Sequence, residues 1–215
     1  MNKKIHDKAR LTYGLKQEIS PRDILFRQGE CARKCYFISK GHLKLTALTP
    51  NGRQVIVHYI GTGDFAGIVP VLDQTTYPAT AEAVAQTELT EWDRTQITRL
   101  LKETPDIVAK ALHTTARHLE ILRNRYVELC GEPAAQRIAR AVMAFGNNAG
   151  SKTARGVRIN ITLSRQDIAD YVGATVHTVS RVLSAWEKAG WLRSGREKIT
   201  VTAPDMIGRI AEKNQ

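Results

Sequence analysis

The sequence predicts an α+β protein with three successive parts, at residues 1–103, 104–130 and 131–215. Three observations carry this prediction. The first part has short β-rich runs separated by glycines, and the second is a long helical stretch that begins at a proline. The third contains two helix patterns joined by a tight turn, followed by a short run of alternating residues. We therefore expect an antiparallel β domain, a long helix and a helix-turn-helix domain.

The β-rich region extends from Glu18 to about Trp92. Its runs are short and regularly spaced, and Asn51-Gly52 is a strong hairpin signal between two of them. This arrangement predicts an antiparallel barrel or sandwich.

A helical region follows. Residues 93–103 predict a short connecting helix, and Thr104-Pro105 provides a cap and a first-turn proline for a helix that runs to about Leu129. Cys130 to Pro133 interrupts the pattern and predicts a hinge. One continuous apolar seam is expected along the long helix, formed by Ile107, Ala111, Leu112, Leu119, Leu122, Tyr126 and Leu129.

Beyond the hinge, Pro133 begins another helix. The segment from Gly146 to Gly156 is rich in Gly, Asn, Ser and Lys and predicts a mobile loop. Residues 157–163 then predict a strand.

The stretch from Leu163 to Leu192 predicts two helices and a turn. Ser164 caps the first helix, Gly173 ends it in a left-handed conformation, and Thr175 caps the second. The inner stripe of the second helix consists of Val179, Val182, Leu183 and Trp186. An ordinary helical hairpin with a solvated polar face would share this pattern. The residues that follow favour a DNA-binding helix-turn-helix over such a hairpin.

Those residues form a predicted wing. Arg193 precedes a turn at residues 194–197, and Lys198, Ile199, Thr200 and Val201 alternate as in a small basic hairpin.

The whole stretch resembles the winged helix-turn-helix of the Crp/Fnr family of bacterial transcription regulators, which has a Thr-Val-Ser-Arg tetrad early in its recognition helix, here Thr178 to Arg181. Gly-Asp-Phe-x-Gly at Gly63 to Gly67 resembles the double-stranded β-roll of cyclic-nucleotide-binding domains. The resemblance implies a β-roll sensor, a dimerisation helix and a DNA-binding domain. It also implies double-stranded DNA, a second copy of the chain and RNA polymerase as partners.

Candidate DNA contacts follow from the resemblance, position by position. The positions that hold the DNA backbone are Ser164, Arg165, Gln166, Thr175 and Thr178. The base-facing positions are Val176, His177, Ser180 and Arg181. Arg181 can donate to O6 and N7 of guanine, although a phosphate contact or a salt bridge is the alternative. His177 replaces the glutamate of most family members, which predicts a half-site altered at that base pair relative to TTGAT or TGTGA.

The resemblance also bears on the effector. Cyclic-AMP-binding relatives have a glutamate for the ribose and an Arg-Ser pair for the cyclic phosphate, and here those places fall at Ile68 and at Tyr77-Pro78. We therefore predict an effector other than cyclic AMP. The candidate pocket residues are Gly67, Ile68, Val69, Tyr77 and Pro78.

The sequence leaves the identity of any cofactor undecided. Cys31, Cys35 and Cys130 are a poor match for an iron–sulfur cluster, and plain packing or a dithiol switch are the alternatives. The resemblance makes haem the more serious hypothesis, because several family members bind haem to sense carbon monoxide or nitric oxide. The alternatives are an apolar or aromatic small ligand, or no ligand at all, so the effector is an unknown small molecule or gas. The conceivable haem ligands are His6, His42, His58, His113 and His118, and no metal site is predicted.

The composition agrees with a DNA-binding protein. The 215 residues have a formal net charge of +11 and a pI of about 9.8, which suits a polyanionic partner. No apolar run could span a bilayer and no signal peptide is recognisable, so we expect a cytoplasmic protein with no membrane partner and with reduced thiols.

Two other function classes are weaker. A β-roll module that regulates a protein partner would use the C-terminal helices for protein contacts, and salt-dependent binding to duplex DNA separates the two classes. An enzyme is disfavoured because no clustered nucleophile and base, carboxylate pair or phosphate loop occurs. Activation and repression both stay open, since the difference depends on where binding sites lie relative to promoters.

Overall fold

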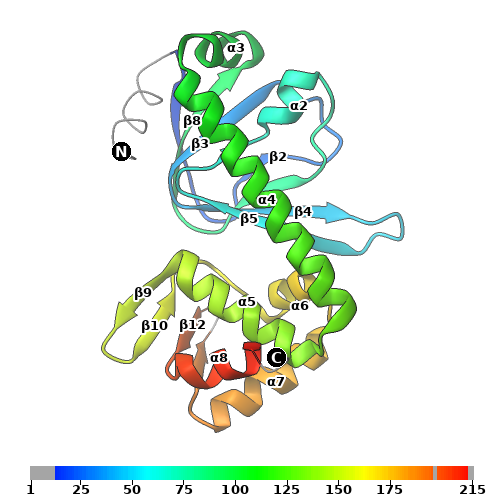
Figure 1. Cartoon of the computed structure of the whole chain (residues 1–215), viewed down its shortest axis with the longest axis vertical. Coiled ribbons are helices and arrows are strands. Elements are labelled where there is room, and N and C mark those ends of the chain that lie inside the picture. Colours follow the sequence, from blue (N-terminus) through cyan, green and yellow to red (C-terminus); the bar gives the residue numbers. More distant parts are fainter. Residues whose placement is uncertain (1–12, 196–197, 213–215) are drawn as a thin grey trace. The chain divides into compact units, whose positions relative to one another are not determined.

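The computed structural model describes residues 13–195 and 198–212. The chain divides into two compact units, Met1–Leu122 and Arg123–Gln215, and each is described by itself (Figure 1). Among the described helices, none has the length and apolar character that crossing a bilayer requires.

The first unit contains two four-stranded antiparallel sheets, with strand orders β1-β8-β3-β6 and β2-β7-β4-β5. Strands far apart in the sequence are neighbours, since the first strand pairs with the eighth. This topology confirms the predicted antiparallel β domain. The strands are β1 (Leu15–Ile19), β2 (Ile24–Phe26), β3 (Lys34–Lys40), β4 (His42–Leu48), β5 (Gln54–Gly61), β6 (Phe65–Ala66), β7 (Thr80–Ala83) and β8 (Thr87–Asp93).

Strand β3 belongs to two hydrophobic cores at once. Tyr36 and Ile38 lie in the core that joins the two sheets, whereas Cys35 and Phe37 lie in a second core with Trp92. Successive side chains of a strand point to opposite faces, so a strand covered on both sides is apolar throughout. This explains the uninterrupted apolar run at the centre of β3.

Two short features complete the first unit. The predicted hairpin at Asn51-Gly52 joins β4 to β5, and the Thr49 N–H donates to the Arg53 carbonyl across it at 2.9 Å. Helix α2 (Ile68–Asp73) was not predicted. Its six residues are too few for a helical period to be visible, and burial of Ile68 and Val71 in the second core holds it.

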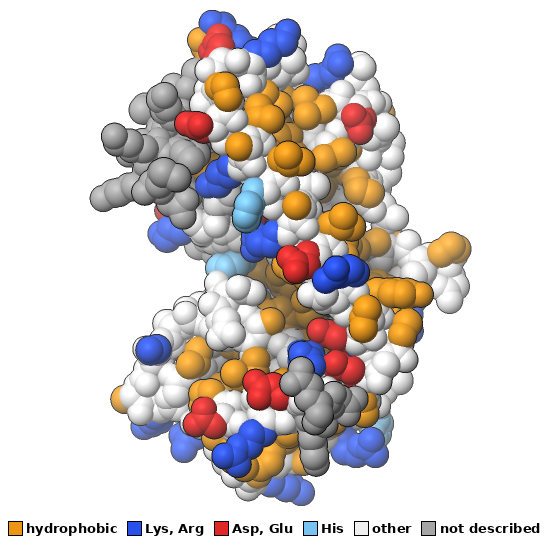
Figure 2. Space-filling model, viewed as in Figure 1, with side chains coloured by type: hydrophobic (Ala, Val, Ile, Leu, Met, Phe, Trp, Pro, Cys, Tyr) orange, Lys and Arg blue, Asp and Glu red, His pale blue; other side chains and the backbone are white. Residues whose placement is uncertain are grey.

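The structure contains both helices that were predicted for residues 93–129. Helix α3 (Arg94–Glu103) begins with a capping box between Asp93 and Gln96, and helix α4 (Pro105–Gly131) is continuous. The single apolar seam predicted for α4 separates into two faces. Ile107 and Ala111 pack against the second core. A second set of apolar side chains is exposed, namely Val108, Leu112, Leu119, Leu122, Tyr126 and Leu129. Hydrophobic side chains follow the path of α4 in Figure 2.

The second unit is built on α5, whose Ile138, Ala139 and Val142 are buried. A four-stranded antiparallel sheet has the order β11-β12-β10-β9. The elements are α5 (Ala134–Ala149), β9 (Gly150–Thr153), β10 (Gly156–Ile159), α6 (Arg165–Val172), α7 (Val176–Lys188), β11 (Leu192–Gly195), β12 (Lys198–Val201) and α8 (Pro204–Glu212).

The mobile loop predicted from Gly146 to Gly156 is wrong. The last turn of α5 continues to Ala149, and β9 then pairs with β10 from Gly150↔Ile159 to Gly156↔Thr153. Because β9 is an edge strand, its polar and glycine residues suit an exposed position while its backbone is hydrogen-bonded to β10. The strand predicted at 157–163 is correspondingly shorter and ends at Ile159.

The compact units divide after Leu122, which is N-terminal to the hinge predicted at Cys130 to Pro133. The last turns of α4 belong to the second unit, where Arg125 lies over the Tyr171 ring and donates to the Tyr171 carbonyl oxygen. The boundaries predicted for the sensor domain, the dimerisation helix and the DNA-binding domain, at residues 1–103, 104–130 and 131–215, remain a prediction.

Candidate nucleic-acid interface

Helix α6 begins at a capping box. The Ser164 hydroxyl accepts the Asp167 N–H at 3.0 Å, and the Asp167 carboxylate accepts the Ser164 N–H at 2.9 Å. This confirms the predicted cap and fixes where the helix starts.

The turn between α6 and α7 depends on Gly173. Its φ of 66° is left-handed, and a Cβ there would lie 2.8 Å from Leu129 Cδ1. Thr175 then caps α7, because its hydroxyl accepts the Thr178 N–H at 3.1 Å. The Thr175 and Thr178 hydroxyls also lie 3.0 Å apart. Both predicted caps and the left-handed end of α6 are therefore present.

The inner face of α7 is buried as predicted. Val179, Leu183 and Trp186 are buried and recur at the helical period, with Val182 partly buried beside them. This stripe fixes the rotation of α7 about its axis, so the polar residues between these positions must face away from the core.

Those outward residues include every predicted base-facing position. Val176, His177, Ser180 and Arg181 line one shallow concavity together with Ser184. Within the described part of the chain, His177 and Arg181 make no hydrogen bond or ion pair, so their donors are available. Sequence reasoning missed Ser184, although its spacing of three and four residues from Arg181 and Ser180 was a usable signal.

Arg165 and Gln166, like the predicted backbone-binding residues Ser164, Thr175 and Thr178 of the caps, are engaged within the protein. Arg165 Nη2 lies 3.2 Å from Glu187 Oε2, and Gln166 Nε2 donates to Asp170 Oδ1 at 2.8 Å. Glu187 also accepts the Ser194 N–H at 2.8 Å and the Ser194 hydroxyl. No sequence pattern indicated Glu187, because its partners are 22 and 7 residues away and lie on other elements.

The predicted wing hairpin is present in β11 and β12, which pair antiparallel from Leu192↔Val201 to Gly195↔Lys198. Arg193 and Lys198 are exposed on it. Arg196 and Glu197, at the predicted turn, lie outside the described residues.

The candidate effector residues of the β domain have different environments. Tyr77 and Ile68 are buried, whereas Val69 and Pro78 are exposed. Tyr77 stacks on Phe26 with ring centroids 3.9 Å apart, and its hydroxyl donates to the Lys34 carbonyl at 2.5 Å. A Cβ at Gly67, where φ is 71°, would lie 2.9 Å from Tyr77 Cε1. The Tyr77 ring therefore occupies the space directly beside Gly67.

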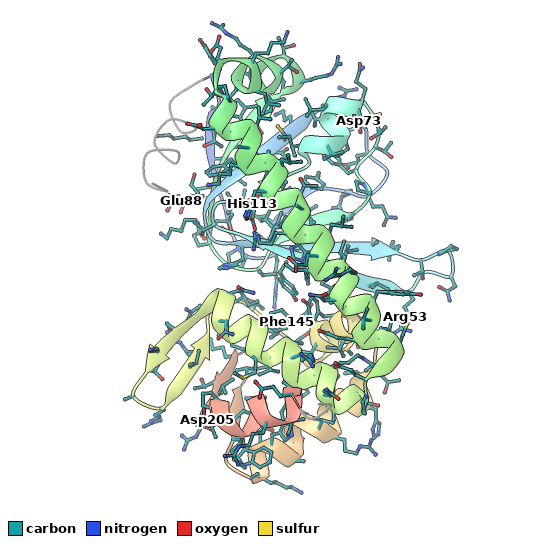
Figure 3. All side chains as sticks on the ribbon, in the orientation of Figure 1. Arg53, Asp73, Glu88, His113, Phe145 and Asp205 are labelled. Carbon is teal, nitrogen blue, oxygen red and sulfur yellow. The ribbon has the colours of Figure 1, made fainter. Side chains whose placement is uncertain are left out.

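Two of the candidate haem ligands meet although they are distant in sequence. The His58 ring on β5 lies 4.4 Å from the His118 ring on α4, edge to face. Asp64 Oδ2 is 3.7 Å from His118 Nε2, and Arg117 Nη2 is 2.5 Å from Asp64 Oδ1. His42 is partly buried and His113 is exposed on α4, as labelled in Figure 3. His6 lies outside the described residues, in which no group of three or more His, Cys, Asp or Glu is placed to hold a metal ion.

The cysteines are free thiols in different environments. Cys31 and Cys130 are exposed, and Cys35 is buried. Burial raises the pKa of the Cys35 thiol to about 12, so plain packing, one of the alternatives considered, suits Cys35.

Comparison with known families agrees with this geometry. Residues 16–104 match the cyclic nucleotide-binding domain, and residues 136–210 match the Crp-like helix-turn-helix domain. The two matches and the fold define a DNA-binding transcription regulator rather than an enzyme. The chain belongs to the Crp/Fnr family.

Individual relatives cover nearly the whole chain. A CRP-like cAMP-activated global transcriptional regulator of Mycobacterium tuberculosis (strain CDC 1551 / Oshkosh) is 24% identical over 94% of this chain and 91% of its own. A probable transcriptional activator of Rhizobium leguminosarum bv. viciae is 29% identical over 90% and 79%. The fold is similar to that of a CRP-family regulator from Thermus thermophilus, with a TM-score of 0.80, 20% identity and coverage of 91% and 96%.

Proposed function

We propose that this regulator binds a palindromic DNA site as a homodimer and that an effector other than cyclic AMP controls its affinity. The observation that carries the proposal is the exposed face of α7, where His177, Ser180 and Arg181 line one concavity and their side chains are turned away from the core. A helix with this face can enter a major groove.

Base contacts then come from α7, and backbone contacts come from its surroundings. Arg181 donates to a guanine, and His177 donates to guanine or accepts from an amino group. The backbone is held by Ser164, Arg165, Gln166, Thr175 and Thr178. His177 in place of glutamate sets a half-site that departs from the family's at one base pair.

The DNA proposal is tested by selecting sites from random duplexes and measuring affinity by fluorescence anisotropy. Arg181→Ala is expected to weaken binding about 10- to 100-fold and to relax specificity at one base pair. Lys188→Ala, which removes the same charge from an exposed position of the same helix, should change affinity much less. Binding that is indifferent to sequence and to Arg181 would contradict the proposal and favour a protein partner.

The homodimer rests on the exposed face of α4. Its apolar residues Val108, Leu112, Leu119, Leu122, Tyr126 and Leu129 follow one another at alternating spacings of three and four, with Thr115 as the polar member. This is the heptad spacing of a coiled coil, and a second copy of the same helix is its natural partner. A two-fold dimer would present two recognition helices about 34–36 Å apart, which matches half-sites one duplex turn apart.

Sedimentation analysis tests the dimer. Leu119 is 69% exposed on the seam, and Leu119→Glu is expected to give monomers. Val127 is 63% exposed on the same helix but off the seam, so Val127→Glu is the matched control and should remain dimeric. A monomeric unmodified chain would contradict the proposal.

The exclusion of cyclic AMP is supported by the residues at the pocket. Ile68 offers no acceptor for a ribose hydroxyl, and the Tyr77 ring stacked on Phe26 offers no positive charge for a phosphate. Some relatives are named cAMP-activated, so calorimetry with cyclic AMP is the direct test. No measurable heat is expected, and tight binding would contradict the proposal.

For the effector itself, we favour an apolar or aromatic small molecule over a gas bound to haem. His58 and His118 pack against each other and His118 faces Asp64, so haem ligation by either would require rearrangement. The spectrum of the protein purified without oxygen from haem-supplied cells decides this point. An intense Soret band that shifts with carbon monoxide would establish haem, and protein absorption alone would direct the search to apolar ligands. Regulation in the cytoplasm, with RNA polymerase as a partner, completes the proposal.

A further inference from the structure

Glu187 connects the three elements of the candidate interface. It lies in the last turn of α7, and its two carboxylate oxygens have different partners. Oε2 lies 3.2 Å from Arg165 Nη2 at the start of α6, and Oε1 accepts the Ser194 N–H of β11 at 2.8 Å as well as the Ser194 hydroxyl. One side chain therefore joins the first helix, the recognition helix and the wing.

These polar contacts cross a cavity between α6, α7 and the wing. This cavity is lined by Leu163, Arg165, Leu183, Glu187, Ser194 and Ile199, among others. Across this space, the ion pair and the hydrogen bonds of Glu187 connect the Arg165 side chain and Ser194 to α7. They add to the pairing of β11 with β12 and the burial of Leu192, which already hold the wing strand. Glu187 lies about two turns, or roughly 10 Å, beyond Ser180 along α7, and its carboxylate is engaged by Arg165 and Ser194.

The Arg165 guanidinium has five N–H donors, and the contact with Glu187 uses one nitrogen. The Arg165 side chain is 38% exposed, so its other donors can reach solvent. A carboxylate near DNA also repels phosphate, and that effect alone would make Glu187 unfavourable for binding. We expect the contacts with Arg165 and Ser194 to outweigh this repulsion, so that the net effect of Glu187 on DNA affinity is favourable. An arginine and a wing that are already held in place lose less conformational entropy when DNA binds.

We propose that Glu187 is a positioning residue for DNA binding, which holds Arg165 and the wing so that both present donors to one stretch of the DNA backbone. This inference rests on the proposed function, because it requires DNA at the α7 face.

The test is Glu187→Gln in the full chain, with a fluorescein-labelled duplex that carries the selected site. Glutamine keeps an acceptor for Ser194 but loses the ion pair. We expect affinity to fall about 3- to 10-fold and the slope of log affinity against log salt to become shallower, since a phosphate contact of Arg165 is lost. Glu212→Gln, an exposed residue of α8 with the same change of charge, is the control and should leave both quantities unchanged.

A double-mutant cycle separates positioning from a general effect on folding. If Glu187 acts through Arg165, Glu187→Gln should add nothing to the loss caused by Arg165→Ala. Ser194→Ala removes only the hydroxyl contact with Glu187. We expect this variant to bind DNA more weakly and to show faster amide exchange in β11. Thermal unfolding of each variant shows whether it is folded at the assay temperature.

The outcomes are distinguishable. If the unmodified chain fails to bind any duplex, the proposed function fails. If it binds and Glu187→Gln binds equally or more tightly with the same salt slope, the positioning role is overturned. Full additivity of Glu187→Gln and Arg165→Ala would overturn it as well.

Discussion

The guanidinium carbon of Arg125 lies 3.9 Å from the centre of the Tyr171 ring. Arg125 stands near the end of α4 and Tyr171 in α6, and Arg125 also donates to the Tyr171 carbonyl oxygen. Arg137 of α5 donates to the neighbouring Val172 carbonyl at 3.0 Å. Two arginines thus bind the carbonyl end of α6, where cations are favourable. Arg125 attaches the last turns of α4 to α6, and Arg137 attaches α5 to it.

The first prediction concerns Arg125. Arg125→Ala should lower the free energy of unfolding of the second unit by about 1–2 kcal/mol, because it removes a partly buried cation–π contact and a hydrogen bond. Amide exchange in α6 should rise in the same variant. The control is Arg123→Ala, which removes an exposed arginine bonded to its neighbour Asn124 and should change stability little. Equal effects of the two variants would contradict this assignment.

The second prediction concerns Gly173. Gly173→Ala introduces a side chain at φ 66° and places its Cβ 2.8 Å from Leu129 Cδ1. The expected loss is about 1–2 kcal/mol in urea unfolding, from the left-handed conformation alone. Adding Leu129→Ala should relieve only the steric part. Gly208→Ala, in α8 with open space around its Cβ, should be neutral or stabilising, and a neutral Gly173→Ala would refute the argument.

The third prediction concerns Asp64 in the first unit. Burial alone would raise its pKa, but the contact with His118, the Gly61 N–H and the Arg117 charge outweigh burial and lower the pKa below its ordinary value. A carboxyl group with a lowered pKa stabilises the folded state at pH values above its unfolded pKa, and this contribution is lost as the pH falls through the folded pKa.

Asp64→Asn should therefore reduce stability by about 1–3 kcal/mol at pH 7. The difference from the unmodified chain should shrink once the pH falls below about 4. Urea unfolding between pH 7 and pH 3 measures this. Asp73→Asn, at an exposed carboxylate labelled in Figure 3, is the control, and a pH-independent effect of Asp64→Asn would show that the charge is irrelevant.

The fourth prediction concerns the thiols. Since burial raises the pKa of Cys35 to about 12, almost none of it is thiolate at pH 8, and its access to solvent is also blocked. A disulfide reagent should label the exposed Cys31 and Cys130 in the native protein, and Cys35 only after unfolding. Rapid labelling of Cys35 in the native state would contradict its buried position. Cys35→Ser, which leaves a hydroxyl in the core, should also destabilise the first unit.

Local signals were enough to predict much of the fold. Capping at Ser164 and Thr175, the left-handed Gly173 and the stripe Val179, Leu183 and Trp186 are set by residues a few positions apart, so the helix-turn-helix could be recognised from order and spacing. The same holds for the hairpin at Asn51-Gly52. The family resemblance rests on these patterns, and the proposed base-facing positions of α7 are what that resemblance implies.

Tertiary packing decided the rest, because it joins residues whose separation in sequence carries no signal. His58 meets His118, and Glu187 meets Arg165, through elements that only the packed units bring together. The seam of α4 divided because Ile107 and Ala111 are covered by the core of the first unit while Leu112 and Leu119 are not. Periodicity identifies an apolar helix face, but burial by a neighbouring element determines which part of that face stays available to a partner.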